Sequence, residues 1–528
     1  MHIMGILMKK NKINSPKNFY FLKNIIIFFP LLIYLDKRSP IAFDEGYYIL
    51  QAKFILSTND WIAPRFFNGI VLDRTIGIQA IIAFFQKIFG GNLFFSYMPN
   101  IFAGILTLYL TFLIHRELLG KKYAIISPII LSTTFLWINY FHMATQDIVY
   151  GSLVTLGILS SIKSYKTNKN LYIFLSGIWV GLAFMLKTYM IAIPIICIIP
   201  FLIGSRIINS KFFWIGIFIG FLPFTIWSYN FIQSYSFETY GGLYEKLITL
   251  SNKNTFTKPF YYYVWNLILN CLPWSLLSLL GFLYNFKVKD KLVNFFLCKY
   301  PLFIVILLSI FSTKTPYYPI QILPLISINA YCGVSCLSTK KNLFIQIIRF
   351  INFRLLPLIL FLSSFYINKI DFINDLNFSS KLFIFISFTI FSVTWFLSTL
   401  SENLNHKIIL LTFGPYLLFS VFVQNGIFTD RSKEIRLAIE KIVNQELLYD
   451  KEVEFIRGEN SLENETSKLI RIAIMTPKIG NGINSIDKLQ KNRYAWTSLK
   501  KEEILAKDID KIIFSPKVLQ PWKLIYKD

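Results

Sequence analysis

Long apolar runs separated by short basic segments make up most of the chain. Many of these runs approach or exceed the ~20 residues that an α-helix needs to cross a membrane. The runs expected to cross, some with flanking residues added, are 24–35, 97–115, 123–146, 148–162, 170–186, 188–205, 212–237, 259–286, 300–313, 315–339, 355–368, 382–401 and 408–429. The pattern predicts an all-α polytopic membrane protein with about 13 transmembrane helices of ~20 residues each.

Other segments have shorter periodic patterns. Residues 45–57 and 75–89 have apolar positions at helical spacing beside polar ones, which predicts two juxtamembrane helices on the outer side. After residue 424 the pattern changes: 435–445 is helical, whereas 469–475 and 511–514 are typical of short strands. We therefore expect a transmembrane domain over residues 1–424 and a small α/β domain over residues 425–528.

Composition excludes several classes of protein. Charged residues are 16% of the chain and mean hydropathy is +0.52, whereas soluble globular chains carry about 25% charged residues. The net charge of +25 alone would suggest nucleic-acid binding. The basic residues lie between apolar runs, however, as in polytopic membrane proteins. We expect contact with membrane lipids and no nucleic-acid partner.

The distribution of Lys and Arg predicts the orientation. Five lysines precede the first apolar run: Lys9, Lys10, Lys12, Lys17 and Lys23. This places the N-terminus in the cytoplasm, and thirteen spans place the tail after Gln424 outside. Richness in Lys, Asn and Ile is typical of an AT-rich bacterial source, so we expect the inner membrane with a periplasmic tail.

The loop after the first run carries the densest polar pattern. It contains Asp44-Glu45-Gly46-Tyr47-Tyr48, then Asp60-Trp61-Ile62-Ala63-Pro64-Arg65, then Asn68-Gly69 and Asp73-Arg74. Ionisable groups close to lipid are costly, and their presence indicates a functional site. An ordinary hydrated loop with charges at helix ends is the alternative.

This loop resembles that of the GT-C glycosyltransferases that use polyprenyl-phosphate sugars, in particular the aminoarabinose transferase of lipid A and the protein O-mannosyltransferases. Further parts follow in the expected order: Thr145-Gln146-Asp147, Met185-Leu186-Lys187-Thr188, Leu272-Pro273-Trp274, Ser312–Tyr318 and Ile322-Leu323-Pro324-Leu325. The resemblance covers residues 19–424. It implies a sugar donor linked to a polyprenyl phosphate, and a lipid or protein acceptor on the outer side.

The resemblance also suggests which residues form the site. Asp44, Asp147 and Glu45 are the candidate catalytic acids, because transfer to a hydroxyl needs a general base. Cations stabilise a departing phosphate, and Arg74, Lys187 and Lys314 are the candidates; anchoring at the lipid headgroups is the alternative role for each. Candidate substrate-binding residues are Tyr48, Arg65, Tyr317 and Tyr318.

A divalent metal ion is the only cofactor that the resemblance implies, with Asp73 as its candidate ligand. In related enzymes a His in the large middle loop helps to hold this ion, and residues 234–258 contain no His. The family commonly has Glu-Lys-Pro-Pro where this chain has Asp73-Arg74-Thr75-Ile76. The charge signs survive in this segment, but the rigid Pro pair is absent. The missing His argues against a metal site of the family's type.

Two other functions remain open. A lipid or glycan transporter, or a flippase, would favour ionisable groups in the middle of spans and an internal repeat, and no repeat is evident. An O-antigen ligase or polymerase would also use basic external loops, but would not need Asp-Glu-x-x-Tyr directly after the first span.

Overall fold

The computed structural model describes most of the chain. The described residues are 25–32, 38–67, 69–72, 74–243, 257–339, 343–366, 373, 376–456, 463–480, 482–505, 509, 511–513 and 516–528.

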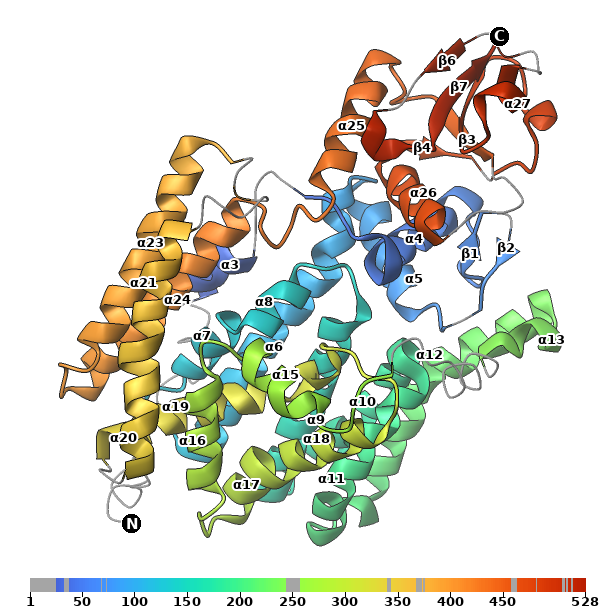
Figure 1. Cartoon of the computed structure of the whole chain (residues 1–528). Helices are drawn as coiled ribbons and strands as arrows, with labels where there is room; N and C mark the ends of the chain where they lie inside the picture. Colours follow the sequence, from blue (N-terminus) through green and yellow to red (C-terminus); the bar gives the residue numbers. More distant parts are fainter. Residues whose placement is uncertain are drawn as a thin grey trace.

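Helices dominate the molecule up to Gln424 (Figure 1). The helices of the bundle are α6 (Met98–Leu119), α9 (Gln146–Thr167), α10 (Asn170–Lys187), α11 (Ala192–Gly204), α12 (Lys211–Tyr235), α17 (Lys291–Asn294), α18 (Tyr300–Ile310), α19 (Leu323–Thr339), α20 (Leu343–Phe350), α21 (Leu356–Tyr366), α23 (Phe378–Leu397) and α24 (Leu404–Gln424). Shorter helices are α3 (Phe29–Leu32), α7 (Ile126–Ser132), α8 (Phe135–Phe141), α13 (Phe237–Tyr240), α15 (Tyr262–Asn270) and α16 (Ser275–Asn285).

Nine helical stretches of the described chain are long and apolar enough to cross a membrane, or ten if α15 and α16 form one span. The structure therefore supports a multi-pass membrane protein without confirming the expected 13 crossings. The difference of four spans has four sources. The nine count α10 and α11 as one stretch, Asn170–Gly204. Residues 123–146 form the short helices α7 and α8, and the pair α15 and α16 is bent. Of residues 24–35, the described part, 25–32, forms only short helices.

The expected span at 259–286 is bent. Helices α15 and α16 meet at 116° around Leu272-Pro273-Trp274. The indole nitrogen of Trp274 donates to the hydroxyl of Thr133 at 3.0 Å, so the bend is tied to the junction between α7 and α8. The Pro-Trp motif thus marks a break in the helix.

Helices α10 and α12 pack with their backbones in contact. Each carries two glycines four residues apart, Gly177 and Gly181 on α10, and Gly216 and Gly220 on α12. A β-carbon on Gly177 would lie 2.2 Å from the carbonyl oxygen of Phe213, and the other three positions are equally tight. This is the small-xxx-small pattern through which helices approach closely in membranes.

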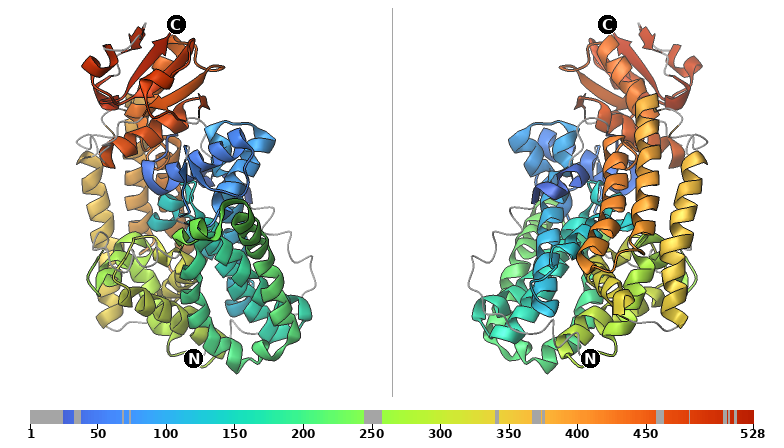
Figure 2. Two further views of the ribbon diagram at one scale, coloured as in Figure 1. Left: turned by 90° about the vertical axis from the view of Figure 1, so that its right-hand side faces the viewer. Right: turned by 90° about the vertical axis from the view of Figure 1, so that its left-hand side faces the viewer.

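Helices were expected within residues 45–57 and 75–89, and both are present, as α4 (Tyr47–Thr58) and α5 (Gly77–Phe89). A small hairpin of β1 (Arg65–Phe66) and β2 (Gly69–Ile70) lies between them in sequence. Figure 2 shows from two sides that α4 and α5 lie at the same end of the helix bundle as the C-terminal tail. The first loop and the tail therefore lie close together.

The tail contains a five-stranded mixed sheet in the order β4-β3-β5-β7-β6. Strand β3 is parallel to β4 and β5, whereas β7 is antiparallel to β5 and β6. The strands are β3 (Glu452–Ile456), β4 (Lys478–Ile479), β5 (Arg493–Thr497), β6 (Lys511–Ile513) and β7 (Lys523–Lys527), and the helices are α25 (Lys433–Gln445), α26 (Glu463–Met475) and α27 (Lys501–Leu505).

One expectation for the tail was wrong. Residues 469–475 were predicted as a strand and form the last two turns of α26. Ile470, Ile472 and Ile474 are all at most 3% exposed, although they point to different sides of the helix. Apart from Arg471 the segment is apolar, so it shows no clear amphipathic helical period, and its β-branched residues then favour the prediction of a strand.

Candidate functional site

A buried ion pair joins the start of α9 to the end of α10. The two helices form an antiparallel hairpin through residues 168 and 169, so Asp147 at the start of α9 meets Lys187 at the end of α10. The ammonium of Lys187 donates to the Asp147 carboxylate, and each side chain is 6% exposed. Each charge also suits the dipole of its own helix, because an acid lies at an N-terminus and a base at a C-terminus.

Three tyrosines surround this pair. The Lys187 ammonium lies 5.4 Å from the ring centre of Tyr150, 5.3 Å from that of Tyr317 and 5.6 Å from that of Tyr318. These distances are within the range of cation–π attraction. The lysine is therefore held by one carboxylate and by the faces of three rings.

A second, more open pair forms in the first loop. A guanidinium nitrogen of Arg74 lies 3.4 Å from the Asp44 carboxylate and donates to the hydroxyl of Tyr48. Asp44 is 45% exposed and Arg74 is 20% exposed. Asp44 is therefore the accessible acid of the site, whereas Asp147 is enclosed.

Helix α5 brings the two pairs together. The hydroxyl of Thr75 donates to the carbonyl of Met185 at 2.7 Å. A β-carbon on Gly77 would lie 2.3 Å from the same carbonyl oxygen, so the start of α5 contacts the end of α10 directly. Arg74 and Lys187 are thereby held at one junction.

The electrostatics of Tyr317 also indicate that the two acids lie close together. Burial raises the pKa of the Tyr317 phenol, and the negative charges of Asp44 and Asp147 raise this pKa further. For Tyr48, burial again raises the pKa, Arg74 opposes this, and the same two acids add to the rise. Both carboxylates therefore act on one group of tyrosines.

Two residues of the site have strained backbones. Asp44 has φ 59° and ψ −83°, and Thr188, directly after Lys187, has φ 44° and ψ −121°. Such conformations cost about 1–3 kcal/mol each in residues other than glycine, and they persist where the surrounding structure enforces them. Because one strained residue lies in or beside each pair, the fold holds these charges in defined positions.

Glu45 has a different environment from the one expected of a catalytic acid. It is 1% exposed, and its carboxylate accepts from the backbone amides of Ile41 at 3.0 Å and Ala144 at 3.1 Å. Arg38 lies 3.4 Å from it. The carboxylate is directed into the protein, where it ties the first loop to the chain just before α9.

Lys314 and Arg65 are bound outside the two pairs. The Lys314 ammonium is buried, which lowers its pKa, and it donates to the carbonyls of Lys258, at 3.1 Å, and Phe311. Arg65 forms an ion pair with Asp60 at 3.0 Å and donates to Tyr235 at the end of α12. Their expected roles in binding phosphate and substrate stay predictions.

The described residues do not fit a divalent metal ion. Asp73, the predicted ligand, lies outside them. Within the described ranges no group of three His, Cys, Asp or Glu side chains is placed to hold an ion. Asp44 and Asp147 each face a cation already, so their negative charge is compensated by the protein.

Sequence reasoning missed Tyr150 as a site residue. It follows Asp147 by three positions on α9, so both side chains lie on the same face of the helix. That spacing could have identified it as a neighbour of the acid. Tyr140 was missed as well, and its ring centre lies 5.0 Å from that of Tyr317.

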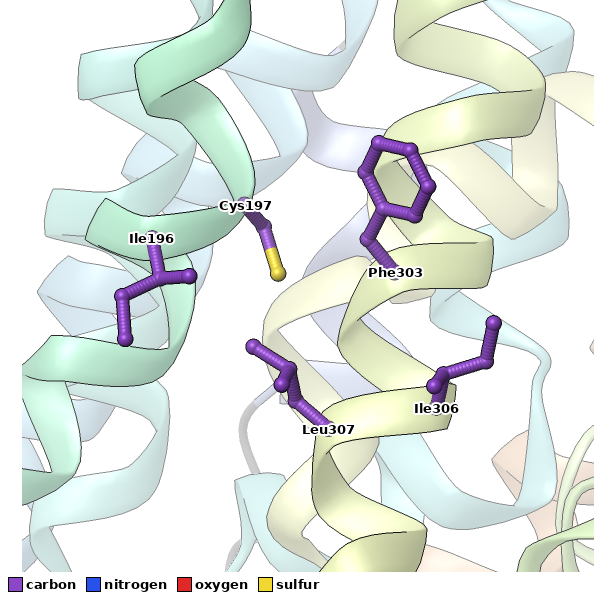
Figure 3. A pocket seen from close by; sticks show the side chains of 5 residues that line it. All are labelled: Ile196, Cys197, Phe303, Ile306 and Leu307. Atoms are coloured by element: carbon purple, nitrogen blue, oxygen red, sulfur yellow. The ribbon is translucent and has the colours of Figure 1, made fainter.

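An apolar pocket of about 170 Å³ lies between α11 and α18. Figure 3 shows its lining, which is Ile196 and Cys197 from α11, and Phe303, Ile306 and Leu307 from α18. Ile196 follows Lys187 by nine residues, which places it roughly 15 Å further along the chain at the rise of 3₁₀ and α helices. The pocket therefore lies deeper in the bundle than the ion pairs.

Comparison with known proteins gives both sequence and structural relatives. Residues 73–229 match the family of dolichyl-phosphate-mannose-protein mannosyltransferases. The undecaprenyl phosphate-alpha-4-amino-4-deoxy-L-arabinose arabinosyl transferase of Wigglesworthia glossinidia brevipalpis is 27% identical over 60% of this chain and 58% of its own length. The enzyme of the same name from Edwardsiella ictaluri is 26% identical over 44% of each chain. The chain thus spans about half the length of these curated relatives.

The solved structure of ArnT from Cupriavidus metallidurans, bound to undecaprenyl phosphate, has a TM-score of 0.74 to this chain. It is 14% identical in sequence, and the match covers 97% of this chain and 98% of that one. This likeness establishes a shared fold over nearly the whole chain, including the tail. The family match, the sequence relatives and the fold together show that the chain resembles the GT-C glycosyltransferases of the aminoarabinose-transferase type.

Proposed function

We propose that this protein is an inverting glycosyltransferase that moves a sugar from a polyprenyl-phosphate donor to a lipid or protein acceptor. It acts on the periplasmic face of the bacterial inner membrane, with its N-terminus in the cytoplasm and its tail in the periplasm. The names of the sequence relatives and the undecaprenyl phosphate bound to ArnT support this donor class.

The observation that carries the proposal is the junction of α5 and α10, where two cation–carboxylate pairs adjoin. Transfer from a phosphate-linked sugar needs positive charge at the leaving phosphate and a base at the acceptor. Arg74 and Lys187 supply the first, and the exposed carboxylate of Asp44 supplies the second.

In the reaction, Asp44 takes the proton of the acceptor hydroxyl as that oxygen forms a bond to the anomeric carbon. The bond between this carbon and the phosphate oxygen breaks, and its electron pair leaves with the polyprenyl phosphate. Arg74 can hold the phosphate through two nitrogens, and Lys187 acts as a point charge. Asp147 keeps Lys187 in place, and no step requires a metal ion.

The pocket between α11 and α18 suits the lipid part of the donor. Its lining is entirely apolar, and its volume is smaller than the roughly 300–1,000 Å³ of ordinary ligand sites. At about 170 Å³ it would hold only a short segment of an isoprenoid chain.

The charged residues also distinguish this function from transport. A transporter would place its ionisable groups near the middle of the membrane, whereas Asp147 and Lys187 lie at helix ends and Asp44 precedes α4. A transferase that uses a lipid-linked sugar reacts at the boundary between membrane and water, where helix ends lie.

Activity in membranes tests the proposal. Membranes that contain the protein are supplied with undecaprenyl-phosphate sugars, and glycolipids and glycoproteins are analysed by mass spectrometry. We expect Asp44→Asn to lower transfer by about 10²–10⁴-fold, because the amide cannot take up the proton. Asp290→Asn is the matched control, since Asp290 caps α17 and asparagine caps a helix equally well.

Donor binding is measured separately with undecaprenyl phosphate as the probe, by native mass spectrometry. Arg74→Ala and Lys187→Met are expected to weaken binding by about 10-fold or more, because each removes a charged contact. Lys87→Ala removes an exposed cation of α5 and provides the control. Wild-type transfer by Asp44→Asn, or unchanged binding by both cation variants, would refute the proposal.

A further inference from the structure

The segment that carries Asp44 runs along the linker between α24 and the tail. The amide of Ser39 donates to the carbonyl of Thr429 at 3.1 Å, and the amide of Arg431 donates to the carbonyl of Ser39 at 3.0 Å. The hydroxyl of Ser432 donates to the carbonyl of Pro40 at 2.8 Å. The start of the first loop is therefore attached to the start of the tail.

The next residues of this segment contact α26. A β-carbon on Gly46 would lie 2.9 Å from a methyl carbon of Ile474 and 3.0 Å from one of Ile470. Gly46 follows Asp44 by two residues, and its amide donates to the carbonyl of Ile41 at 3.1 Å. A β-carbon on Gly46 would also lie 2.5 Å from the carbonyl oxygen of Ile41, so the glycine fits both the turn of the loop and its contact with α26.

A lysine of α4 fixes the end of α26. The Lys53 ammonium donates to the carbonyls of Ile474 at 2.5 Å and Thr476 at 2.9 Å. Carbonyls in the last turn of a helix have no partner within the helix, so these contacts satisfy groups that need one. Lys53 lies two turns after Gly46 and on the same face of the chain.

From these contacts we infer that the tail contributes to the active site: Ile470 and Ile474 of its helix α26 position Asp44. The inference rests on the proposed role of Asp44 as the base. A strained backbone such as that of Asp44 persists where its surroundings fix it. Glu45 fixes the segment from the membrane domain, and α26 fixes it from the tail.

Matched isoleucine variants of α26 test this inference. Ile474 and Ile472 are 3% and 0% exposed and lie on opposite faces of one helix, so both alanine variants lose the same buried atoms. Ile474→Ala should lower kcat by about 10–100-fold, the effect of a small misplacement of a catalytic group. KM for the donor should change less than about twofold, because Arg74 and Lys187 hold the phosphate. Ile474→Val, which lacks the Cδ1 methyl that lies against Gly46, should lower kcat in the same direction by a smaller factor.

Ile472→Ala should keep the kcat of the wild type per folded molecule, with folding measured by size exclusion. Lys53→Met provides a second variant without a core cavity, and it too should lower kcat and spare KM. If Ile474→Ala does not fold, Lys53→Met tests the inference in its place.

Unchanged kcat in Ile474→Ala or in Lys53→Met would overturn the inference. Equal losses in the two isoleucine variants would also overturn it, because they would indicate general destabilisation. Asp44→Asn separates this outcome from failure of the proposed function. If that variant is inactive while Ile474→Ala is normal, the positioning role alone fails; if it is fully active, the proposed base fails first.

Discussion

The Asp147–Lys187 pair allows a test in which stability and function are expected to separate. Both side chains are 6% exposed, so Lys187→Met leaves a buried carboxylate without its cation. Removal of one partner of a buried pair costs about 3–5 kcal/mol, whereas replacement of both by neutral groups is often close to neutral. We therefore expect Lys187→Met to be strongly destabilised, and Asp147→Asn/Lys187→Met to recover most of the stability.

The assay is thermal unfolding in detergent, followed by tryptophan fluorescence, together with binding of undecaprenyl phosphate. The double variant should fold well and still bind the probe poorly, because no cation replaces Lys187. Lys166→Met is the control: Lys166 pairs with Glu117 at the other end of α9, and the two side chains are 34% and 24% exposed. Such exposed pairs contribute about 0–1 kcal/mol.

Two results would refute this reasoning. A Lys187→Met variant as stable as the wild type would mean that the Asp147 carboxylate is not desolvated. Full binding of undecaprenyl phosphate by the double variant would mean that the phosphate is held without Lys187.

Three further predictions concern single residues. Arg74→Lys should lower transfer by about 10-fold or more, because lysine cannot reproduce the planar guanidinium that faces Asp44 and Tyr48; wild-type rates in the membrane assay would contradict this. Thr188→Gly should raise the stability in thermal unfolding by about 1 kcal/mol, since glycine adopts a positive φ without strain. Burial lowers the pKa of Lys53 from 10.5 to about 8, so the unfolded chain binds more protons than the folded one between these values. Stability should therefore rise from pH 8 to 10.5, and this part of the pH profile, measured by thermal unfolding, should be absent in Lys53→Met.

The sequence pattern was sufficient to predict those parts of the site whose residues lie close together along the chain. Asp44, Tyr48 and Arg74 share one loop, and their motif brings them together as expected. Asp147 and Lys187 were each assigned to a helix end, but not to each other. Because α9 and α10 form a hairpin and have similar lengths, the start of α9 lies beside the end of α10. The pairing of Asp147 with Lys187 could therefore have been predicted from the sequence.

Other features of the site and of the tail depend on contacts between segments that are distant in sequence. No local pattern in a single sequence indicates such contacts. The carboxylate of Glu45 is bound by the amide of Ala144, about one hundred positions away. Nothing in the neighbourhood of Glu45 distinguishes it from the adjacent Asp44. The helix α26 is another case, because its packing on several sides outweighs the strand preference of its isoleucines.

The glycine contacts between α10 and α12 limit how a lipid substrate can reach the site. Backbones that meet at Gly177, Gly181, Gly216 and Gly220 leave no width for an acyl or isoprenoid chain between the two helices. A donor that diffuses in the bilayer cannot pass through this seam to Lys187. The proposed donor would therefore have to reach Lys187 from a side of the bundle other than the α10–α12 seam.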